Sequence, residues 1–200
     1  MAPKISEEAK EERRISILKA ALECFSVKGY YASTVDDIVK FARLSKGSVY
    51  NYFESKEDIF IGILRHEQRK TQDRLKAALA QIESPLEKLK YWINTDIPYS
   101  VNKKKLMRVH VEFWLYSTGS PDVQHILKER FDVIFYMIKE IIEEGQQMGE
   151  FKQDIDPGQA SEMFWSLHDG IWLHAIIGYD EAKLEDHIRE MEKVMLAYLL

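Results

Sequence analysis

The chain contains few of the residues that cross-link a fold or interrupt its secondary structure. Its 200 residues include one cysteine, five prolines and nine glycines. A single cysteine excludes a disulfide framework and a cysteine-based metal site. Cys24 stands among apolar positions of an expected helix, which favours a small core residue over a reactive thiol.

Long apolar runs are also absent. No uninterrupted apolar stretch approaches the roughly 20 residues that a membrane-spanning helix needs. The N-terminal stretch MAPKISEEAKEERR is charged and has no apolar segment of the kind found in a signal peptide. We therefore expect a cytoplasmic protein.

The composition is typical of a soluble globular protein, with 46% apolar and 30% charged residues. Few runs of β-branched residues alternate with polar ones, whereas apolar residues recur at helical spacing along much of the chain. We therefore predict an all-α fold of about nine helices, with an N-terminal three-helix unit followed by a larger helical body.

The net charge of −5 is unevenly distributed. Residues 1–56 hold ten Lys and Arg against eight Asp and Glu, a net charge of +2, whereas the remainder holds eighteen against twenty-five, a net charge of −7. A basic N-terminal region joined to an acidic body is consistent with a protein that contacts DNA at one end only.

The stretch 34–58, TVDDIVKFARLSKGSVYNYFESKED, predicts two short helices and the start of a third around a tight turn. Thr34 is placed to cap the first helix, and the carboxylates that follow it suit a helix N-terminus. Ser45 caps the second helix, which we expect to run to about Phe53. Ser55 opens the third with an S-x-x-D capping box.

The middle helix carries the candidate DNA contacts. Val49 and Phe53 can pack inward, which leaves a cation, a small residue, a hydroxyl, a phenol and an amide on or near the outer side. A short recognition helix presents such groups to base edges in the major groove. Phenol and ammonium groups also suit phosphate oxygens. The candidate DNA-binding residues are Thr34, Ser45, Lys46, Gly47, Ser48, Tyr50, Asn51, Tyr52 and Lys56.

The pattern G-x-V-Y-x-Y-F-x-S-K-E-D at 47–58 resembles the helix-turn-helix signature of the TetR family of transcriptional regulators. The resemblance extends back through the segment 25–30, Thr34 and the Asp-Ile pair at 37–38, and so covers the first third of the chain. It implies a helix-turn-helix DNA-binding domain at 1–56 and a ligand-binding and dimerisation domain at 57–200.

Caps and breaks predict the remaining helices. Residues 1–9 are expected to form an arm, and the first helix to run from Lys10 to Lys28 with Gly29 as its C-cap. The helix that begins at Ser55 shows no stop signal before Ser84-Pro85, and the resemblance implies that this connecting helix transmits the regulatory switch. Further helices are predicted from Pro85 to before Pro98, and at about 103–116, 121–148, 157–177 and 181–200.

An enzyme is the main rival class. The H-E-x-x-H pattern, a glycine-rich phosphate loop and a nucleophile elbow are all absent from the sequence. His168 and Asp169 are adjacent, so on a helix their side chains are expected to diverge by about 100° and not to orient each other. We therefore predict no catalytic residues, no metal site and no cofactor.

Aromatic and histidine side chains at three- and four-residue steps on two expected helices could border a small-molecule pocket. The candidate ligand-binding residues are His110, Phe113, Trp114, Trp165, His168 and Trp172. Gly170 would leave room beside them, and the resemblance implies an inducer pocket at these helices. The aromatic content favours a flat or hydrophobic ligand, whereas Glu112 or Glu67, if turned inward, would favour a cation. The alternative is that the aromatic side chains only fill the core.

The last two expected helices have broad apolar sides that exceed the needs of one small core. The candidate dimer-interface residues are Met163, Leu167, Ile171, Leu184, Met191 and Met195. The resemblance implies that these helices form a four-helix bundle with a second copy. Two recognition helices one turn of DNA apart would then read a palindrome.

We therefore expect a homodimeric TetR-like regulator of double-stranded DNA, a repressor that a small hydrophobic or aromatic ligand releases from a palindromic operator. Two alternatives stay open. A regulator of the same fold could activate transcription or respond to a protein partner, or the chain could be a helical binding or catalytic protein that does not use DNA.

Overall fold

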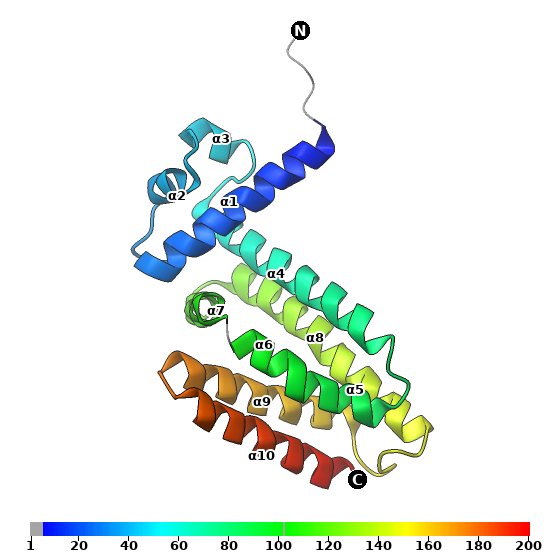
Figure 1. Ribbon diagram of the computed structural model, residues 1–200. Helices are drawn as coiled ribbons and strands as arrows, with labels where there is room; N and C mark the ends of the chain where they lie inside the picture. Colours follow the sequence, from blue (N-terminus) through cyan, green and yellow to red (C-terminus); the bar gives the residue numbers. More distant parts are fainter. Residues whose placement is uncertain (1–5, 102) are drawn as a thin grey trace. The chain divides into compact units, whose positions relative to one another are not determined.

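The computed structural model describes residues 6–101 and 103–200 (Figure 1). Within these residues every regular element is helical, which confirms the all-α prediction. Because α5, the π-helical segment η1 and α6 follow one another without a break, the described chain forms nine continuous helical rods, as predicted. The elements are α1 (Glu7–Lys28), α2 (Val35–Ala42), α3 (Lys46–Tyr50), α4 (Lys56–Leu79), α5 (Pro85–Tyr91), η1 (Trp92–Asp96), α6 (Ile97–Val101), α7 (Lys104–Ser117), α8 (Pro121–Gln147), α9 (Pro157–Ile176) and α10 (Glu181–Leu199).

The described residues divide into two compact units. The N-terminal unit contains the chain up to Asp73 together with Arg108–Phe113, and the C-terminal unit contains Arg74–Met107 and Trp114–Leu200. The first turns of α4 therefore pack with α1–α3. The middle residues of helix α7 belong to the N-terminal unit, and both of its ends belong to the C-terminal unit.

The N-terminal unit is built on α1, which packs against α2. The Ser6 hydroxyl accepts the Ala9 N–H at 3.1 Å, so α1 begins at Glu7, earlier than predicted. Gly29 ends α1 with a φ of +80°, a conformation that glycine adopts without strain. Residues 1–5 of the expected arm lie outside the described residues, and the rest of the arm caps or begins the helix.

Aromatic rings fill the core of the N-terminal unit. The fully buried Phe60 ring on α4 meets Phe25 edge-on at 5.4 Å and stacks on Tyr30 at 4.4 Å. Phe113 of α7 meets the same ring edge-on at 4.8 Å. Such pairs add about 0.5–1.5 kcal/mol each to the effect of burial alone, so Phe60 holds α1, α4 and the middle of α7 together.

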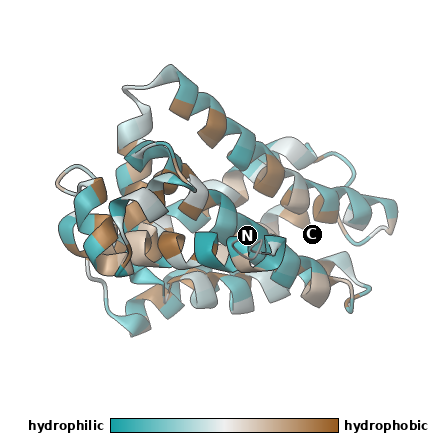
Figure 2. Ribbon diagram, turned by 90° about the horizontal axis from the view of Figure 1, so that it is seen from above, coloured by the Kyte–Doolittle hydropathy of each residue, from teal (hydrophilic) through white to brown (hydrophobic). Residues whose placement is uncertain are grey.

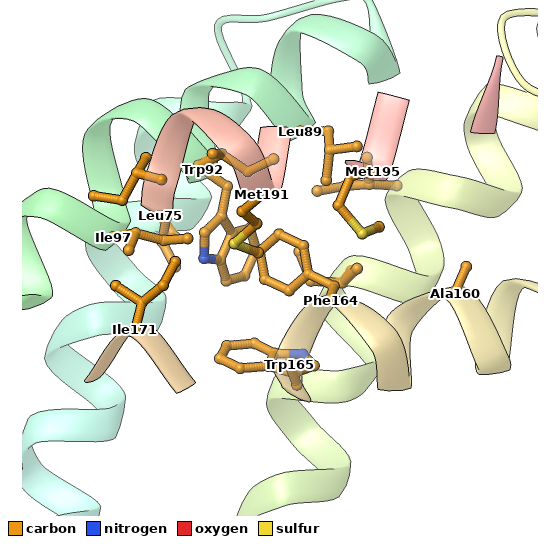
Figure 3. Close-up of a cluster of buried hydrophobic side chains, with 14 of the residues drawn as sticks. Leu75, Leu89, Trp92, Ile97, Ala160, Phe164, Trp165, Ile171, Met191 and Met195 are labelled. Atoms are coloured by element: carbon orange, nitrogen blue, oxygen red, sulfur yellow. The ribbon is translucent and has the colours of Figure 1, made fainter. Parts of the chain in front are cut away.

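The C-terminal unit is a layered helical body. In it α8 packs along α9, α10 packs on α9 and η1, and α5 packs on α8. Trp92, Phe164 and Met191 lie against one another in its core (Figure 3). Burying a large apolar side chain contributes about 1.5–3 kcal/mol, so this shared core fixes the order of the helices.

Helical structure continues through Pro98, where the sequence predicted an end, so that prediction is wrong. Proline has no N–H, and in a regular α-helix its ring would collide with the carbonyl of Asn94, four residues earlier. The π-helical segment widens the turn in front of it: the Ile97 N–H donates to the carbonyl of Trp92, five residues earlier. The rod therefore passes the proline with its hydrogen bonds rearranged.

The helices contain both hydrophilic and hydrophobic residues (Figure 2). Each amphipathic helix turns its apolar stripe to the core and its charged residues outward. None of the helices in the described ranges combines the length with the apolar character needed to cross a membrane.

Candidate functional site

A capping box fixes the start of α2. The Thr34 hydroxyl oxygen accepts the Asp37 N–H at 3.1 Å, and the Asp37 carboxylate accepts the Thr34 N–H at 3.0 Å. Lys28 binds the other carboxylate oxygen at 2.6 Å. The bond to Lys28, and after it the bonds to Thr34, hold the pKa of Asp37 well below its usual range. The predicted capping role of Thr34 is therefore confirmed, and its predicted contact with DNA stays a prediction.

The helix α3 has two distinct sides. Val49 is fully buried against the core, whereas Tyr50 is 46% exposed and Asn51 is exposed. A Cβ added to Gly47 would meet no atom within 4 Å, so this part of the helix is open. The Ser45 hydroxyl caps α3 by accepting the Ser48 N–H at 3.1 Å. The regular helix is shorter than predicted and ends at Tyr50.

Lys46 stands on the open side of α3 and forms an ion pair with Asp36 of α2 at 2.8 Å. The hydrogen bond from Lys46 to Asp36 raises the pKa of the lysine. Both side chains are exposed, and such surface pairs contribute little to stability. Lys46 can therefore exchange this carboxylate for another anion at small cost.

Lys56 does not lie on the exposed surface as the sequence suggested. Its Nζ donates to the carbonyls of Tyr30 at 2.8 Å and of Ser33 at 2.9 Å, and it lies 4.3 Å from the centre of the Tyr30 ring. Burial lowers the pKa of this lysine. The Lys56 side chain therefore holds the loop between α1 and α2, and its predicted phosphate contact stays a prediction. Tyr52 is half-buried.

A second side chain anchors the same loop, although the sequence analysis did not predict this contact. The Glu112 carboxylate of α7 accepts the Tyr30 N–H at 2.5 Å. Nearby, the Arg108 guanidinium reaches the Ser26 carbonyl at 3.4 Å. The contact between Glu112 and Tyr30 joins residues 82 positions apart, so no local pattern could predict it.

The predicted ligand-binding residues are divided between the two units. His110 and Phe113 belong to the N-terminal unit, where Phe113 is a fully buried core residue against Phe60. This placement corrects the prediction for Phe113. Trp114 and the three candidates on α9 belong to the C-terminal unit.

In the C-terminal unit, rings from η1, α7, α8 and α9 form a continuous series that we call the aromatic cluster. Trp114 lies 6.0 Å from Phe131, and Phe135 lies 6.4 Å from Trp165. His168 lies 4.8 Å from Trp165 and 4.9 Å from Trp172. The members of the aromatic cluster are Trp92, Trp114, Phe131, Phe135, Phe164, Trp165, His168 and Trp172.

The expectation that His168 and Asp169 cannot orient each other is wrong. His168 Nδ1 lies 3.1 Å from the Asp169 carboxylate, and His168 itself is only 4% exposed. Nδ1 is the ring nitrogen nearer the main chain, so the short side chain of the next residue can reach it. The carboxylate therefore fixes the orientation of a buried imidazole inside the aromatic cluster.

Two indole N–H groups of the aromatic cluster have no hydrogen-bond acceptor among the residues that the structure describes. They belong to Trp92, which is 1% exposed, and Trp165, which is 7% exposed. A buried donor without an acceptor costs about 1–3 kcal/mol. Buried polar groups normally have a partner, so the two N–H groups mark positions where a hydrogen-bond acceptor would be stabilised.

Four of the predicted dimer-interface residues belong to the core of the chain itself: Ile171, Leu184, Met191 and Met195 are buried. They are unavailable to a second copy, which corrects that part of the prediction. Met163 and Leu167 are half-buried and pack against the same core. The exposed apolar side chains of α9, α10 and the residues next to them are Leu173, Ile177, Val194, Tyr198 and Leu200.

Gly170 faces away from the aromatic cluster. It is two residues from both His168 and Trp172, which places it about 200° from each around α9. A Cβ at Gly170 would meet no atom within 4 Å. The expectation that Gly170 leaves room for a ligand is therefore wrong, and the glycine instead opens the outer side of α9.

The described residues contain no cluster of side chains suited to binding a metal ion. No three His, Cys, Asp or Glu side chains gather there in a way that could hold a metal ion. The single thiol, Cys24, is buried beside the Ser33 hydroxyl at 3.6 Å, and burial raises its pKa. A raised pKa keeps the sulfur in its unreactive thiol form.

Sequence families match both parts of the chain. Residues 17–63 match the bacterial regulatory proteins of the tetR family. Residues 85–199 match the C-terminal region of BetI-type transcriptional repressors, and this second match alone covers more than half of the chain.

Individual relatives agree with the family matches. YfiR of Bacillus subtilis, an uncharacterized HTH-type transcriptional regulator, is 28% identical over 100% of this chain and 98% of its own length. The HTH-type transcriptional regulator QacR of Staphylococcus aureus is 30% identical over 68% of this chain and 71% of its own length. The fold is similar to that of FadR from Bacillus subtilis in complex with stearoyl-CoA, with a TM-score of 0.81, 24% identity, and coverage of 92% of this chain and 97% of that one.

The capped α2, the two-sided α3 and these matches lead to one conclusion. The chain belongs to the TetR family and is a DNA-binding transcriptional regulator.

Proposed function

We propose that this regulator is a homodimeric repressor. It binds a palindromic operator through α2 and α3 and leaves the operator when a small hydrophobic ligand occupies the aromatic cluster. Residues 1–56 then serve as the DNA-binding domain, and residues 57–200 serve for ligand binding and dimerisation. The observation that carries this proposal is the division of α3 into a buried side and an open side.

The open side of α3 suits the major groove. The absence of a side chain at Gly47 lets the backbone approach the DNA closely. Tyr50 and Asn51 bring a phenol and an amide that can donate or accept hydrogen bonds. Lys46 can leave Asp36 for a phosphate, because its ion pair is exposed.

The aromatic cluster favours an uncharged, apolar part of a ligand that carries a hydrogen-bond acceptor. Glu67 and Glu112, the two carboxylates that would favour a cation, both belong to the N-terminal unit, and Glu112 already accepts the Tyr30 N–H. The indole N–H groups of Trp92 and Trp165 suit a carbonyl oxygen. A long-chain acyl thioester has both properties, and the similar FadR structure contains stearoyl-CoA.

The outer sides of α9 and α10 suit a second copy of the chain. Leu173 and Ile177 are exposed along α9 and just beyond its end, and Val194 and Tyr198 are exposed on α10. Gly170 allows another helix to approach α9 closely. We expect Ile177→Asp to shift the protein from dimer to monomer in sedimentation analysis, whereas Val133→Asp on the exposed surface of α8 leaves the dimer intact.

One pair of binding experiments tests this proposal. Wild-type protein should retard the DNA upstream of its own coding region in a mobility-shift assay. Stearoyl-CoA should quench tryptophan emission and release the DNA, and a quaternary ammonium compound should do neither. The two effects must be reciprocal, so operator DNA should weaken acyl-CoA binding by the same factor. Quenching without any release of DNA would contradict the proposed coupling.

A further inference from the structure

Most cations near the helix-turn-helix are already engaged. Lys28 and Lys46 each bind a carboxylate of α2, and Lys56 donates to two carbonyls of the preceding loop. Residues 28–56 are all described, and among their lysines and arginines only Lys40 and Arg43 make no ion pair or side-chain hydrogen bond. Lys40 and Arg43, which the sequence analysis did not single out, can therefore meet a DNA backbone without giving up an existing bond.

The backbone of Arg43 sets it apart from Lys40. Arg43 has φ and ψ of 53° and 42°, and it is the only non-glycine residue with a positive φ in the described chain. It ends α2, with its N–H directed at the carbonyl of Lys40. Glycine or asparagine is common at this kind of position because a Cβ is strained there.

The side chain of Arg43 makes no stabilising contact that would offset this backbone strain. It is exposed and forms no ion pair in the described chain. Strained residues that packing does not require are concentrated at functional sites. Arg43 also stands two residues before Ser45, the N-cap of α3, and so borders the open side of the recognition helix.

We propose that Arg43 binds a phosphate of the operator backbone from the turn between α2 and α3. The inference rests on the proposed reading of DNA by these two helices. A guanidinium can donate two parallel hydrogen bonds to phosphate oxygens, which fixes the register of a protein on DNA without reading a base. Arg43 thereby positions Tyr50 and Asn51 over the base edges.

The test uses Arg43→Gly, because the inference predicts opposite changes in stability and binding. Removing the strain should raise the midpoint of thermal unfolding by roughly 2 °C. Operator affinity should fall about tenfold, and the slope of log affinity against log salt should fall by about one for each Arg43 engaged. Arg43→Lys keeps the charge and should stay within about threefold of wild type in affinity.

Two further variants distinguish a failure of the inference about Arg43 from a failure of the proposed DNA reading by α3. Arg69→Ala removes an exposed arginine from the middle of α4 and should leave operator affinity unchanged. Tyr50→Ala tests the open side of α3. If Arg43→Gly binds like wild type while Tyr50→Ala is impaired, the inference about Arg43 fails and the proposed reading helix stands. If neither variant is impaired, both fail. A joint fall in thermal midpoint and affinity in Arg43→Gly would make Arg43 a structural residue and also overturn the inference.

Discussion

Each of the two compact units of this regulator has an aromatic core, but the units differ in how polar side chains and apolar packing define their geometry. In the N-terminal unit, polar side chains fix the backbone at helix ends: Asp37 closes a capping box, and Lys56 and Glu112 bind the loop between α1 and α2. The C-terminal unit depends on a large core that contains Trp92 and Phe164. Directional bonds define a precise geometry for reading DNA, whereas packed rings define a volume that a ligand can modify.

Truncating the core of the C-terminal unit should have the largest effect. Phe164 is fully buried and meets both Trp92 and Trp165. We expect Phe164→Ala to reduce the free energy of unfolding by about 3–5 kcal/mol, measured by urea denaturation. Val133→Ala on the exposed surface of α8 is the control and should change it by less than about 0.5 kcal/mol. Similar losses in both variants would contradict the assignment of core and surface in the C-terminal unit.

Substitutions at two glycines, one in each unit, should also have contrasting effects. A Cβ at Gly145 in the C-terminal unit would collide with the Phe151 ring, so Gly145→Ala should cost about 1–3 kcal/mol in unfolding free energy. Gly47→Ala on α3 meets open space and should keep or slightly raise stability, but it should weaken operator binding. Thermal unfolding and a DNA titration measure the two effects. A Gly47→Ala variant with full operator affinity would oppose close backbone approach at this point.

Two glutamates provide a matched comparison of polar anchors. Glu112 accepts the Tyr30 N–H in the N-terminal unit, and Glu150 accepts the Ser84 hydroxyl and the Leu86 N–H, both at 2.8 Å, in the C-terminal unit. Replacing either by alanine leaves a donor without its acceptor and should cost about 1–3 kcal/mol in unfolding free energy.

Only the Glu112→Ala variant should also weaken operator binding, because it frees the loop in front of α2. Fluorescence anisotropy with labelled operator measures this difference. Equal losses of DNA affinity in the Glu112→Ala and Glu150→Ala variants would show that overall stability, and not the loop, governs binding.

The smallest expected effect is a dependence of stability on pH at Asp37. Its pKa is lowered in the folded chain from an ordinary value of 3.8, chiefly by Lys28 and then by Thr34. A carboxyl group with a lowered folded pKa stabilises the fold above its unfolded pKa and loses that contribution as the pH falls towards the folded value. The difference in stability between wild type and Asp37→Asn should therefore be complete at pH 7 and shrink below about pH 4. A difference that stays constant down to pH 2 would exclude this cause.

Local signals in the sequence predicted several helix caps correctly. Thr34, Ser45 and Gly29 have the predicted capping roles because a cap depends on residues within one turn of it. The contact of Lys56 with the loop before α2 was missed because its acceptors, the Tyr30 and Ser33 carbonyls, lie more than twenty residues earlier. Local spacing carries no information about such a contact.

Apolar periodicity predicted where the helices lie, but it did not predict whether an apolar face packs in the core of the chain or against a second copy. It grouped the apolar residues of α9 and α10 correctly, but it could not show which side faces the chain's own core. Met191 and Met195 therefore seemed available to a second copy, although they are buried within the monomer. The exposed Ile177 and Val194 were missed, because an apolar residue at helical spacing has the same signature in a core and in an interface.

The most direct test of the account is a titration of operator DNA with wild type and with the Tyr50→Ala, Lys46→Ala double variant, both checked for helical content by circular dichroism. The open side of α3 predicts that the double variant stays folded and binds the operator at least about tenfold more weakly, since one lost base contact costs about 1–3 kcal/mol. A folded double variant that binds the operator as tightly as wild type would contradict the claim that α3 reads the DNA.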